Sequence, residues 1–192
     1  MITKNRFASV VALSVAALLV GCAAPARVEQ MQVSNSLAVR TAAAQSELKD
    51  GIGIKDVTGG KETNPMWVSN VSSADFERAL EASLKDAGLL SGNRQGSKYV
   101  LVAHLAKLEQ PFMGASMTVT ATVRYSLIDR ATNKTVFERD VATPYTAAFS
   151  DAFVGTERLK LANEGAVRTN ITQLINDLVA LKVSVADVQM AK

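Results

Sequence analysis

The chain has 192 residues, of which 48% are hydrophobic, 5% aromatic and 20% charged, and its formal net charge is +3. Two of the 21 basic residues, Lys4 and Arg6, precede an apolar run, so the chain beyond residue 21 holds 19 basic residues against 18 acidic ones. Because these charges nearly balance, are interspersed and accompany few aromatic residues, the composition argues against nucleic-acid binding. The remaining length of about 170 residues suffices for one domain with its own core.

The first 21 residues have the organisation of a signal peptide. A basic head precedes an apolar run from Phe7 to Val20, which has the length of a signal-peptide core, whereas a membrane-spanning helix needs roughly 20 apolar residues. The basic head favours retention of the amino end on the cytoplasmic side during export. The sequence therefore predicts an exported protein from which residues 1–21 are removed.

Cys22 is the single cysteine of the chain and follows the apolar run almost at once. A lone cysteine is most often a buried apolar residue or an inert thiol, but no folded core can surround this one behind a cleavable leader. A disulfide within the chain is excluded because no second cysteine exists. Residues 19–22, Leu-Val-Gly-Cys, resemble the bacterial lipobox. This resemblance implies that the chain is cut before Cys22 and that its thiol takes a diacylglyceryl group, which anchors the protein to a membrane.

The residue after the cysteine is Ala23 rather than aspartate, and by resemblance to enterobacterial lipoproteins this implies the periplasmic face of the outer membrane. We expect a signal peptide over residues 1–21, a lipidated cysteine and tether over 22–47, and a single periplasmic domain over 48–192. The tether is predicted because residues 23–47 are small and polar with weak periodicity. The alternative is that the later half of this segment belongs to the fold as an edge strand or a helix.

The first elements of the domain are a strand and a helix. Alternating apolar residues predict a strand over residues 48–57, followed by a glycine-rich loop through Pro65. Ser72 or Ser73 can cap the next helix, and Gly88 is placed as its left-handed stop. The apolar face of this helix recurs at helical spacing and consists of Phe76, Leu80, Leu84 and Ala87.

Three strands and a long helix follow. Residues 99–109 read as a covered strand, residues 117–129 alternate cleanly as a strand with one wet face, and residues 135–143 pair back as a hairpin. A second helix is predicted over residues 156–181, and residues 182–189 could form a short last strand. The buried stripe expected on the second helix consists of Val167, Ile171, Leu174, Ile175 and Leu178. The order β-α-β-β-β-α predicts an α+β two-layer sandwich, in which two helices pack on one face of a mainly antiparallel sheet.

The glycine-rich loop from Gly59 to Pro65 invites comparison with a phosphate-binding loop. That motif needs a glycine where Lys55 stands and a serine or threonine where Glu62 stands, and a helix should begin at once. We therefore interpret the loop as a glycine-rich connection that leaves a strand.

Catalytic and metal-binding patterns are also weak. His104, the sole histidine, lies in mid-strand, where a structural role is more common than catalysis, and no Gly-x-Ser-x-Gly elbow exists. Ser150 beside Asp151 is ordinary turn chemistry, and no cluster of carboxylates around the histidine suggests a metal site. We expect a protein that is not an enzyme and needs no cofactor or metal.

Apolar side chains in predicted loops are the candidate binding residues. These are Trp67, Phe112, Met113, Tyr145, Phe149 and Phe153. If their loops meet at one end of the sheet, they form an apolar patch for a protein partner or a lipid. The alternative is that they plug the ends of the core.

From Gly59 onward the chain resembles a group of small, uncharacterised Gram-negative lipoproteins. The stretches that carry this resemblance are residues 57–84, 117–129 and 149–175. Some members bear the label UDP-N-acetylglucosamine acyltransferase, but that enzyme class is built from hexapeptide β-helix repeats, and this chain has none. The element order is also similar to that of envelope lipoproteins such as the curli-secretion channel subunit and activators of penicillin-binding proteins, which is a likeness of fold.

These observations predict a lipoprotein on the periplasmic face of the outer membrane that acts as a non-catalytic binding or structural module in envelope assembly or maintenance. Its partners would be the membrane, through the acyl anchor, and an envelope protein. The first alternative is a carrier of a lipid or another apolar ligand. An apolar cavity between sheet and helices would favour the carrier, whereas a filled core with an exposed aromatic patch would favour the module. An acyltransferase-type enzyme is the third alternative.

Overall fold

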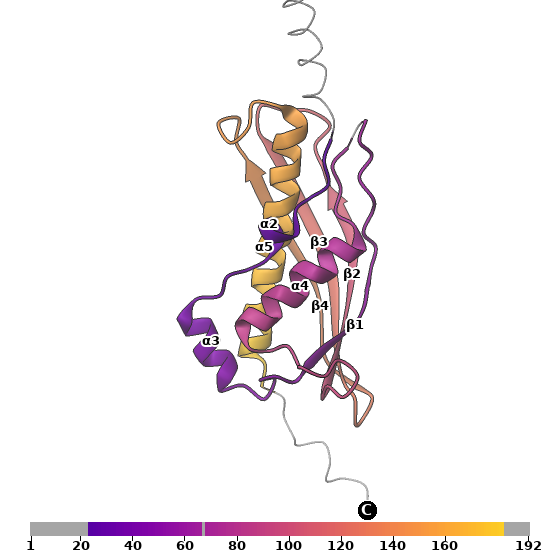
Figure 1. Cartoon of the computed structure of the whole chain (residues 1–192), viewed down its shortest axis with the longest axis vertical. Helices are drawn as coiled ribbons and strands as arrows, with labels where there is room; N and C mark the ends of the chain where they lie inside the picture. Colours follow the sequence, from indigo (N-terminus) through magenta and orange to yellow (C-terminus); the bar gives the residue numbers. More distant parts are fainter. Residues whose placement is uncertain (1–22, 67, 183–192) are drawn as a thin grey trace, which may run out of the picture.

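The computed structural model describes residues 23–66 and 68–182. Its sheet has the order β1-β2-β3-β4, in which β1 runs parallel to β2 and the other neighbours are antiparallel. The strands are β1 (Ile52–Thr58), β2 (Tyr99–Glu109), β3 (Met117–Asp129) and β4 (Lys134–Ala147). Helices α4 (Ser73–Ala87) and α5 (Gly155–Ala180) both cover one face of the sheet (Figure 1). The predicted α+β two-layer sandwich is confirmed.

Helix α4 begins and ends as its sequence predicts. The hydroxyl oxygen of Ser72 accepts a hydrogen bond from the Asp75 backbone N–H at 3.0 Å, which satisfies one of the free donors of the first turn. Gly88 ends the helix with φ 78°, a left-handed conformation that glycine adopts without strain. The side chains of Phe76, Leu80 and Leu84 are fully buried, so this helix packs with its predicted face on the core.

The alternation in β3 separates the two faces of the sheet. Val119, Val123 and Leu127 are fully buried beneath the helices, whereas Thr118 and Arg124 point to the open face. Polar pairs cross this open face, including a bidentate pair in which Arg124 donates to Asp140 at 2.7 and 3.0 Å. The sheet is therefore covered on one side and exposed on the other, as the threonine-rich pattern predicts.

A buried polar network joins α5 to the middle of the sheet. Asn170 is fully buried, and its side-chain amide donates to the backbone carbonyls of Ala121 and Val141 and to the hydroxyl of Thr143. Its carbonyl oxygen accepts a 2.9 Å hydrogen bond from the hydroxyl of Tyr125. Burial raises the pKa of that hydroxyl, so Tyr125 stays neutral and acts as a donor. The network fixes the position of α5 on β3 and β4.

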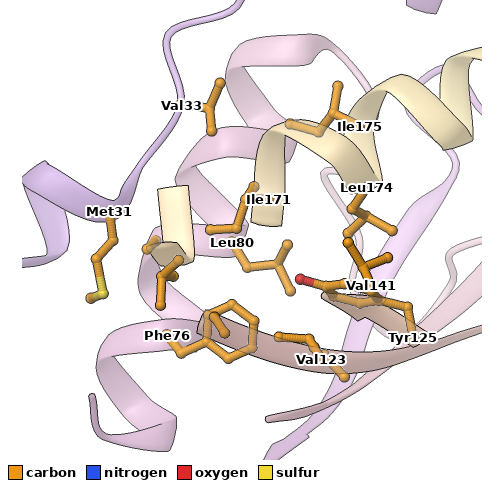
Figure 2. Close-up of a cluster of buried hydrophobic side chains, with 14 of the residues drawn as sticks. Met31, Val33, Phe76, Leu80, Val123, Tyr125, Val141, Ile171, Leu174 and Ile175 are labelled. Carbon is orange, nitrogen blue, oxygen red and sulfur yellow. The ribbon is translucent and has the colours of Figure 1, made fainter. Parts of the chain in front are cut away.

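Residues 23–47, here called the N-terminal segment, differ from the expected tether because they pack on the domain. The segment contains α2 (Val28–Met31) and α3 (Leu37–Ala44), and α2 contacts both α4 and α5. Met31 and Ala43 are fully buried, and Figure 2 shows Met31 and Val33 pointing into the same core as Phe76 and Ile171. The whole segment belongs to the fold, rather than only its later half.

Hydrogen bonds to distant residues fix the path of the N-terminal segment. Arg27 makes a bidentate ion pair with Glu164 on α5, at 2.9 and 3.0 Å, and its backbone N–H donates to the same carboxylate. Glu164 is only 2% exposed, whereas the Arg27 side chain is 46% exposed, so the pair joins a buried carboxylate on α5 to a half-exposed guanidinium. Farther along, the Val33 backbone N–H donates to the hydroxyl of Ser83 on α4 at 2.9 Å. In a free tether, water would be the hydrogen-bond partner of these polar groups, whereas here residues of α4 and α5 take its place.

Asp86 makes the attachment of α3 sensitive to acid. Burial raises the pKa of Asp86, but hydrogen bonds from the backbone and side chain of Asn35 and from Arg40 lower it by more, so the pKa lies below its ordinary value. A carboxylate with a lowered pKa contributes its full stabilisation at pH values above its ordinary, unfolded-state pKa. This stabilisation is lost as the pH falls through the pKa of the folded state. We expect the Asn35 amide signal in NMR to shift during acid titration, and the variant Asp86→Asn to lack that transition. An unchanged transition in Asp86→Asn would contradict this assignment.

Within residues 23–66 and 68–182, no helix combines the length and the apolar character that crossing a membrane requires. The short strand expected over residues 182–189 falls outside the described residues apart from Lys182, which lies in no strand. The signal peptide and Cys22 also lie outside them.

Candidate functional site

The described part of the chain leaves seven large apolar side chains exposed, and six of them belong to three loops at one end of the sheet. We call these six residues the apolar tip: Met66, Phe112, Met113, Phe149, Phe153 and Val154. The pairing of Met117 with Ala147 brings the β2–β3 loop beside the β4–α5 loop, and both lie at the upper end in Figure 1. The seventh side chain, Leu37 on α3, lies at the opposite end.

The two aromatic residues of the β4–α5 loop pack on each other while remaining exposed to solvent. The rings of Phe149 and Phe153 meet edge to face with their centroids 5.4 Å apart, and Phe153 is 79% exposed. Asp151 closes the turn between them because its carboxylate accepts the Ala148 backbone N–H at 2.8 Å. The loop therefore presents its aromatic side chains from a defined turn.

Arg158, in the first turn of α5, joins two of the three loops of the apolar tip, the β2–β3 loop and the β4–α5 loop. It is 5% exposed, and its guanidinium donates to the carbonyls of Ala152 at 2.5 Å and Phe153 at 3.4 Å in one loop and of Gly114 at 3.0 Å in the other. The same guanidinium lies 5.2 Å from the ring centre of Phe149, within reach of a cation–π interaction. One buried cation thus holds both loops in place.

Replacing Arg158 with methionine should loosen the apolar tip more than it destabilises the domain. The change removes hydrogen bonds from a charged donor but also removes a buried charge, so the two effects on global stability partly cancel. Loss of about 1.4 kcal/mol of local stability corresponds to about tenfold faster amide exchange in residues 111–116 and 148–154. Hydrogen–deuterium exchange with mass spectrometry measures this directly.

Arg130→Met is the matched control, because Arg130 also donates to backbone carbonyls but between the loops at the opposite end. It should leave exchange at the apolar tip unchanged. Equal exchange of the tip loops in Arg158→Met and the unaltered protein would show that Arg158 does not hold them.

The structure places four of the residues predicted from the sequence, Phe112, Met113, Phe149 and Phe153, in loops at one end of the sheet, whereas Tyr145 lies on the core face of β4. Trp67 and Cys22 lie outside the described residues. The sequence reasoning missed Met66, Val154 and Arg158. Met66 could have been found, because it stands beside Trp67 in a loop, whereas the sequence contains no signal for the role of Arg158.

Tyr145 belongs to the core side of β4. It lies opposite Val119 in the sheet register and is half-buried against the core cluster. Helix α5 passes so close to its ring that a methyl group on Gly165 would lie 2.2 Å from the Cδ1 atom of Tyr145, and the guanidinium of Arg168 lies 5.8 Å from the ring centre. Glycine at 165 therefore permits a close helix–sheet approach.

The glycine-rich loop and His104 have structural neighbours. Gly59 has φ 85°, and a Cβ atom there would overlap the carbonyl oxygen of Leu105, while one on Gly60 would overlap the backbone of Ser73. The two glycines thus allow the loop to pass between β2 and the start of α4. His104 lies on the exposed face, with its Nδ1 atom 2.9 Å from the hydroxyl of Thr58.

The space between the sheet and the helices is filled by side chains. Figure 2 shows Phe76, Leu80 and Tyr125 meeting Ile171 and Leu174, and all five are fully buried. Hollows of about 300 and 500 Å³ lie elsewhere on the described residues, beside Arg94 and beside Arg168. A cavity of about 210 Å³ lies between the glycine-rich loop and the end of β2. Its lining includes the polar side chains of Lys61, Asn70, Lys107 and Gln110. Among the described residues, no group of three or more histidine, cysteine, aspartate or glutamate side chains could hold a metal ion.

The chain is similar to several solved structures at low sequence identity. No protein-family model and no curated protein sequence matches the chain. A Xanthomonas campestris protein of the DUF330 family is 14% identical, with a TM-score of 0.53 over 68% of this chain and 84% of its own. A minor lipoprotein from Acinetobacter baumannii is 12% identical, with a TM-score of 0.47 over 69% and 94%. Lipoprotein GNA1162 from Neisseria meningitidis is 12% identical, with a TM-score of 0.34 over 68% and 98%. The Xanthomonas structure shows that the chain shares its fold with a DUF330 protein.

Proposed function

We propose that the protein is a lipoprotein of the periplasmic face of the outer membrane, acylated at Cys22, and that it acts as a non-catalytic binding or structural module of the envelope. The observation that carries this proposal is the placement of Ala23, the residue next to the lipobox cysteine. Ala23 is 5% exposed, and its backbone N–H donates to the carbonyl of Pro65 at 2.8 Å, beside Met66 of the apolar tip. The fold thus brings the anchoring end of the chain to its exposed apolar surface.

A filled core supports a module rather than a carrier. A carrier of an apolar ligand needs a largely apolar cavity of about 300 Å³ or more. Here the layer between sheet and helices is occupied by buried side chains. Hollows of about 210, 300 and 500 Å³ lie outside that layer, and each is lined in part by lysine or arginine. The apolar side chains that remain available point outward at the tip, which suits binding at a surface.

Acylation and location are tested by expressing the full chain and the variant Cys22→Ser in a Gram-negative host. We expect the unaltered protein to have the mass of a chain that begins at an acylated Cys22 and to sediment with outer-membrane vesicles in a density gradient. Cys22→Ser should lack the acyl mass and be absent from the outer-membrane vesicles. A free Cys22 thiol in the exported protein would contradict the anchor, whereas an acylated protein in inner-membrane vesicles would contradict only the outer-membrane location.

A further inference from the structure

We propose that the apolar tip lies in the interfacial layer of the bilayer that holds the acyl chains of Cys22. This inference rests on the proposed function and names the lipid bilayer as the occupant of the tip. Three observations support it: the short distance between Cys22 and the fold, the exposed apolar side chains of the tip, and the hydrogen bonds that the loop backbone makes within the protein.

The anchor has no free length with which to lift the domain from the membrane. Ala23 follows Cys22 directly, and consecutive Cα atoms are about 3.8 Å apart. A free tether of the 25 residues from 23 to 47 would instead span about 25–30 Å. Because Ala23 is hydrogen-bonded to Pro65 and Ala26 to Asn70, the chain enters the fold beside the loop that carries Met66.

The exposed side chains at this end suit the boundary between headgroups and acyl chains. Phe112 is 95% exposed, Met66 77% and Met113 74%, and none of the six tip residues carries a charge. Phenylalanine and other large apolar side chains are typical of the face that a peripheral protein buries in this layer. Leu37, which is 81% exposed, lies alone at the other end, so over residues 23–66 and 68–182 grouped apolar exposure occurs at the end where the anchor enters.

Polar backbone groups in the tip loops have hydrogen-bond partners within the protein, as an apolar environment requires. A carbonyl that leaves water without a new partner is costly, and lipid supplies no donor. Arg158 donates to the carbonyls of Gly114, Ala152 and Phe153, so these groups have partners inside the protein. The Ala148 N–H is likewise satisfied by Asp151. A loop that stays in water does not need a buried guanidinium for this purpose.

Contact at the tip fixes the orientation of the domain. Strand β3 has 13 residues and starts at the tip, so it extends about 43 Å toward the opposite end at about 3.3 Å per residue. Helix α3 and Leu37 therefore face away from the bilayer into the periplasm.

The test uses full-length acylated protein in vesicles of phosphatidylethanolamine and phosphatidylglycerol. Because acylation consumes the thiol of Cys22, a cysteine introduced elsewhere is the sole free thiol and can carry an environment-sensitive fluorophore. The variants are Phe112→Cys and Phe153→Cys at the tip, with Leu37→Cys as the matched control on an equally exposed apolar residue. Each is measured with and without a lipid that bears a nitroxide quencher near its headgroup.

We expect the nitroxide lipid to lower the fluorescence at both tip positions by about twofold or more and to leave the label at residue 37 unchanged. Unquenched tip labels on protein that floats with the vesicles would overturn the inference and leave the anchor standing. Tip labels that are shielded from aqueous iodide but not quenched by the lipid would assign the tip to a protein surface and also overturn it. Failure of the protein to float would contradict the anchor itself.

Discussion

Replacing Asn170 with alanine should lower the free energy of unfolding by about 3 kcal/mol, because it leaves several buried polar groups without partners. The Tyr125 hydroxyl loses its acceptor at 2.9 Å, and the carbonyls of Ala121 and Val141 lose donors at 3.1 and 2.8 Å. None of these groups can turn to water, since the site lies between α5 and the sheet. Urea denaturation of the purified protein measures the change.

The matched control is Asn176→Ala, an exposed asparagine on the same helix, which should change stability by less than about 0.5 kcal/mol. The double variant Asn170→Ala with Tyr125→Phe should recover part of the loss, because it removes the orphaned hydroxyl. A loss for Asn170→Ala no larger than that of the control would refute the role of this network in holding α5.

Replacing Arg27 with alanine should release the N-terminal segment and cost about 2 kcal/mol. Breaking a buried ion pair typically costs 3–5 kcal/mol, and the estimate here is lower because the Arg27 side chain remains 46% exposed. Glu164, 2% exposed, would keep only the backbone N–H of residue 27 as a partner. Amide exchange at Met31 and Val33 should accelerate, because their segment loses its attachment to α5.

A double-mutant cycle separates the loss of the Arg27–Glu164 ion pair from the cost of leaving the Glu164 charge buried and unpaired. Arg27→Ala combined with Glu164→Leu should be more stable than Arg27→Ala alone, because no buried charge is left unpaired. Arg40→Ala is the control, since Arg40 pairs with Asp86 at 2.6 Å near the surface and should cost less than about 1 kcal/mol. Unchanged protection of Met31 in Arg27→Ala would mean that the ion pair does not fix the segment.

The regular elements of the sheet and helices could be predicted from the sequence because each carries its own periodicity. The ends of β2 and β3 agree with the prediction. The signal for β2 is a continuous apolar run, and the signal for β3 is clean alternation, which local burial on one face sets. Helix α4 has a serine cap and a left-handed glycine, both of which are local signals. The five-residue stripe predicted on α5 is buried throughout.

The N-terminal segment could not be predicted in this way because its structure depends on distant residues. Helix α2 has four residues and α3 has eight, which is too short for a periodic pattern or for stability in isolation. Arg27 is 137 positions from Glu164, and Val33 is 50 positions from Ser83. A composition of small and polar residues does not distinguish a solvated tether from a segment that such contacts hold on the domain.

The candidate site was predictable in part. Apolar residues are conspicuous in loops between clearly predicted strands and helices. Such loops carry Phe112, Met113, Phe149 and Phe153. Tyr145 was grouped with them because β4 was expected to end at residue 143, but the strand continues to Ala147 and places Tyr145 opposite Val119. The strand continues because Tyr145, Thr146 and Ala147 find partners on β3, and that pairing depends on the tertiary fold rather than on local preference.

Neutron reflectometry of the acylated protein on a supported phosphatidylethanolamine and phosphatidylglycerol bilayer tests most directly whether a packed N-terminal segment holds the apolar tip against the membrane. We expect protein density to begin within the headgroup layer, with no water layer between bilayer and domain. A hydrated gap of about 25–30 Å, the span of a free 25-residue tether, would contradict it.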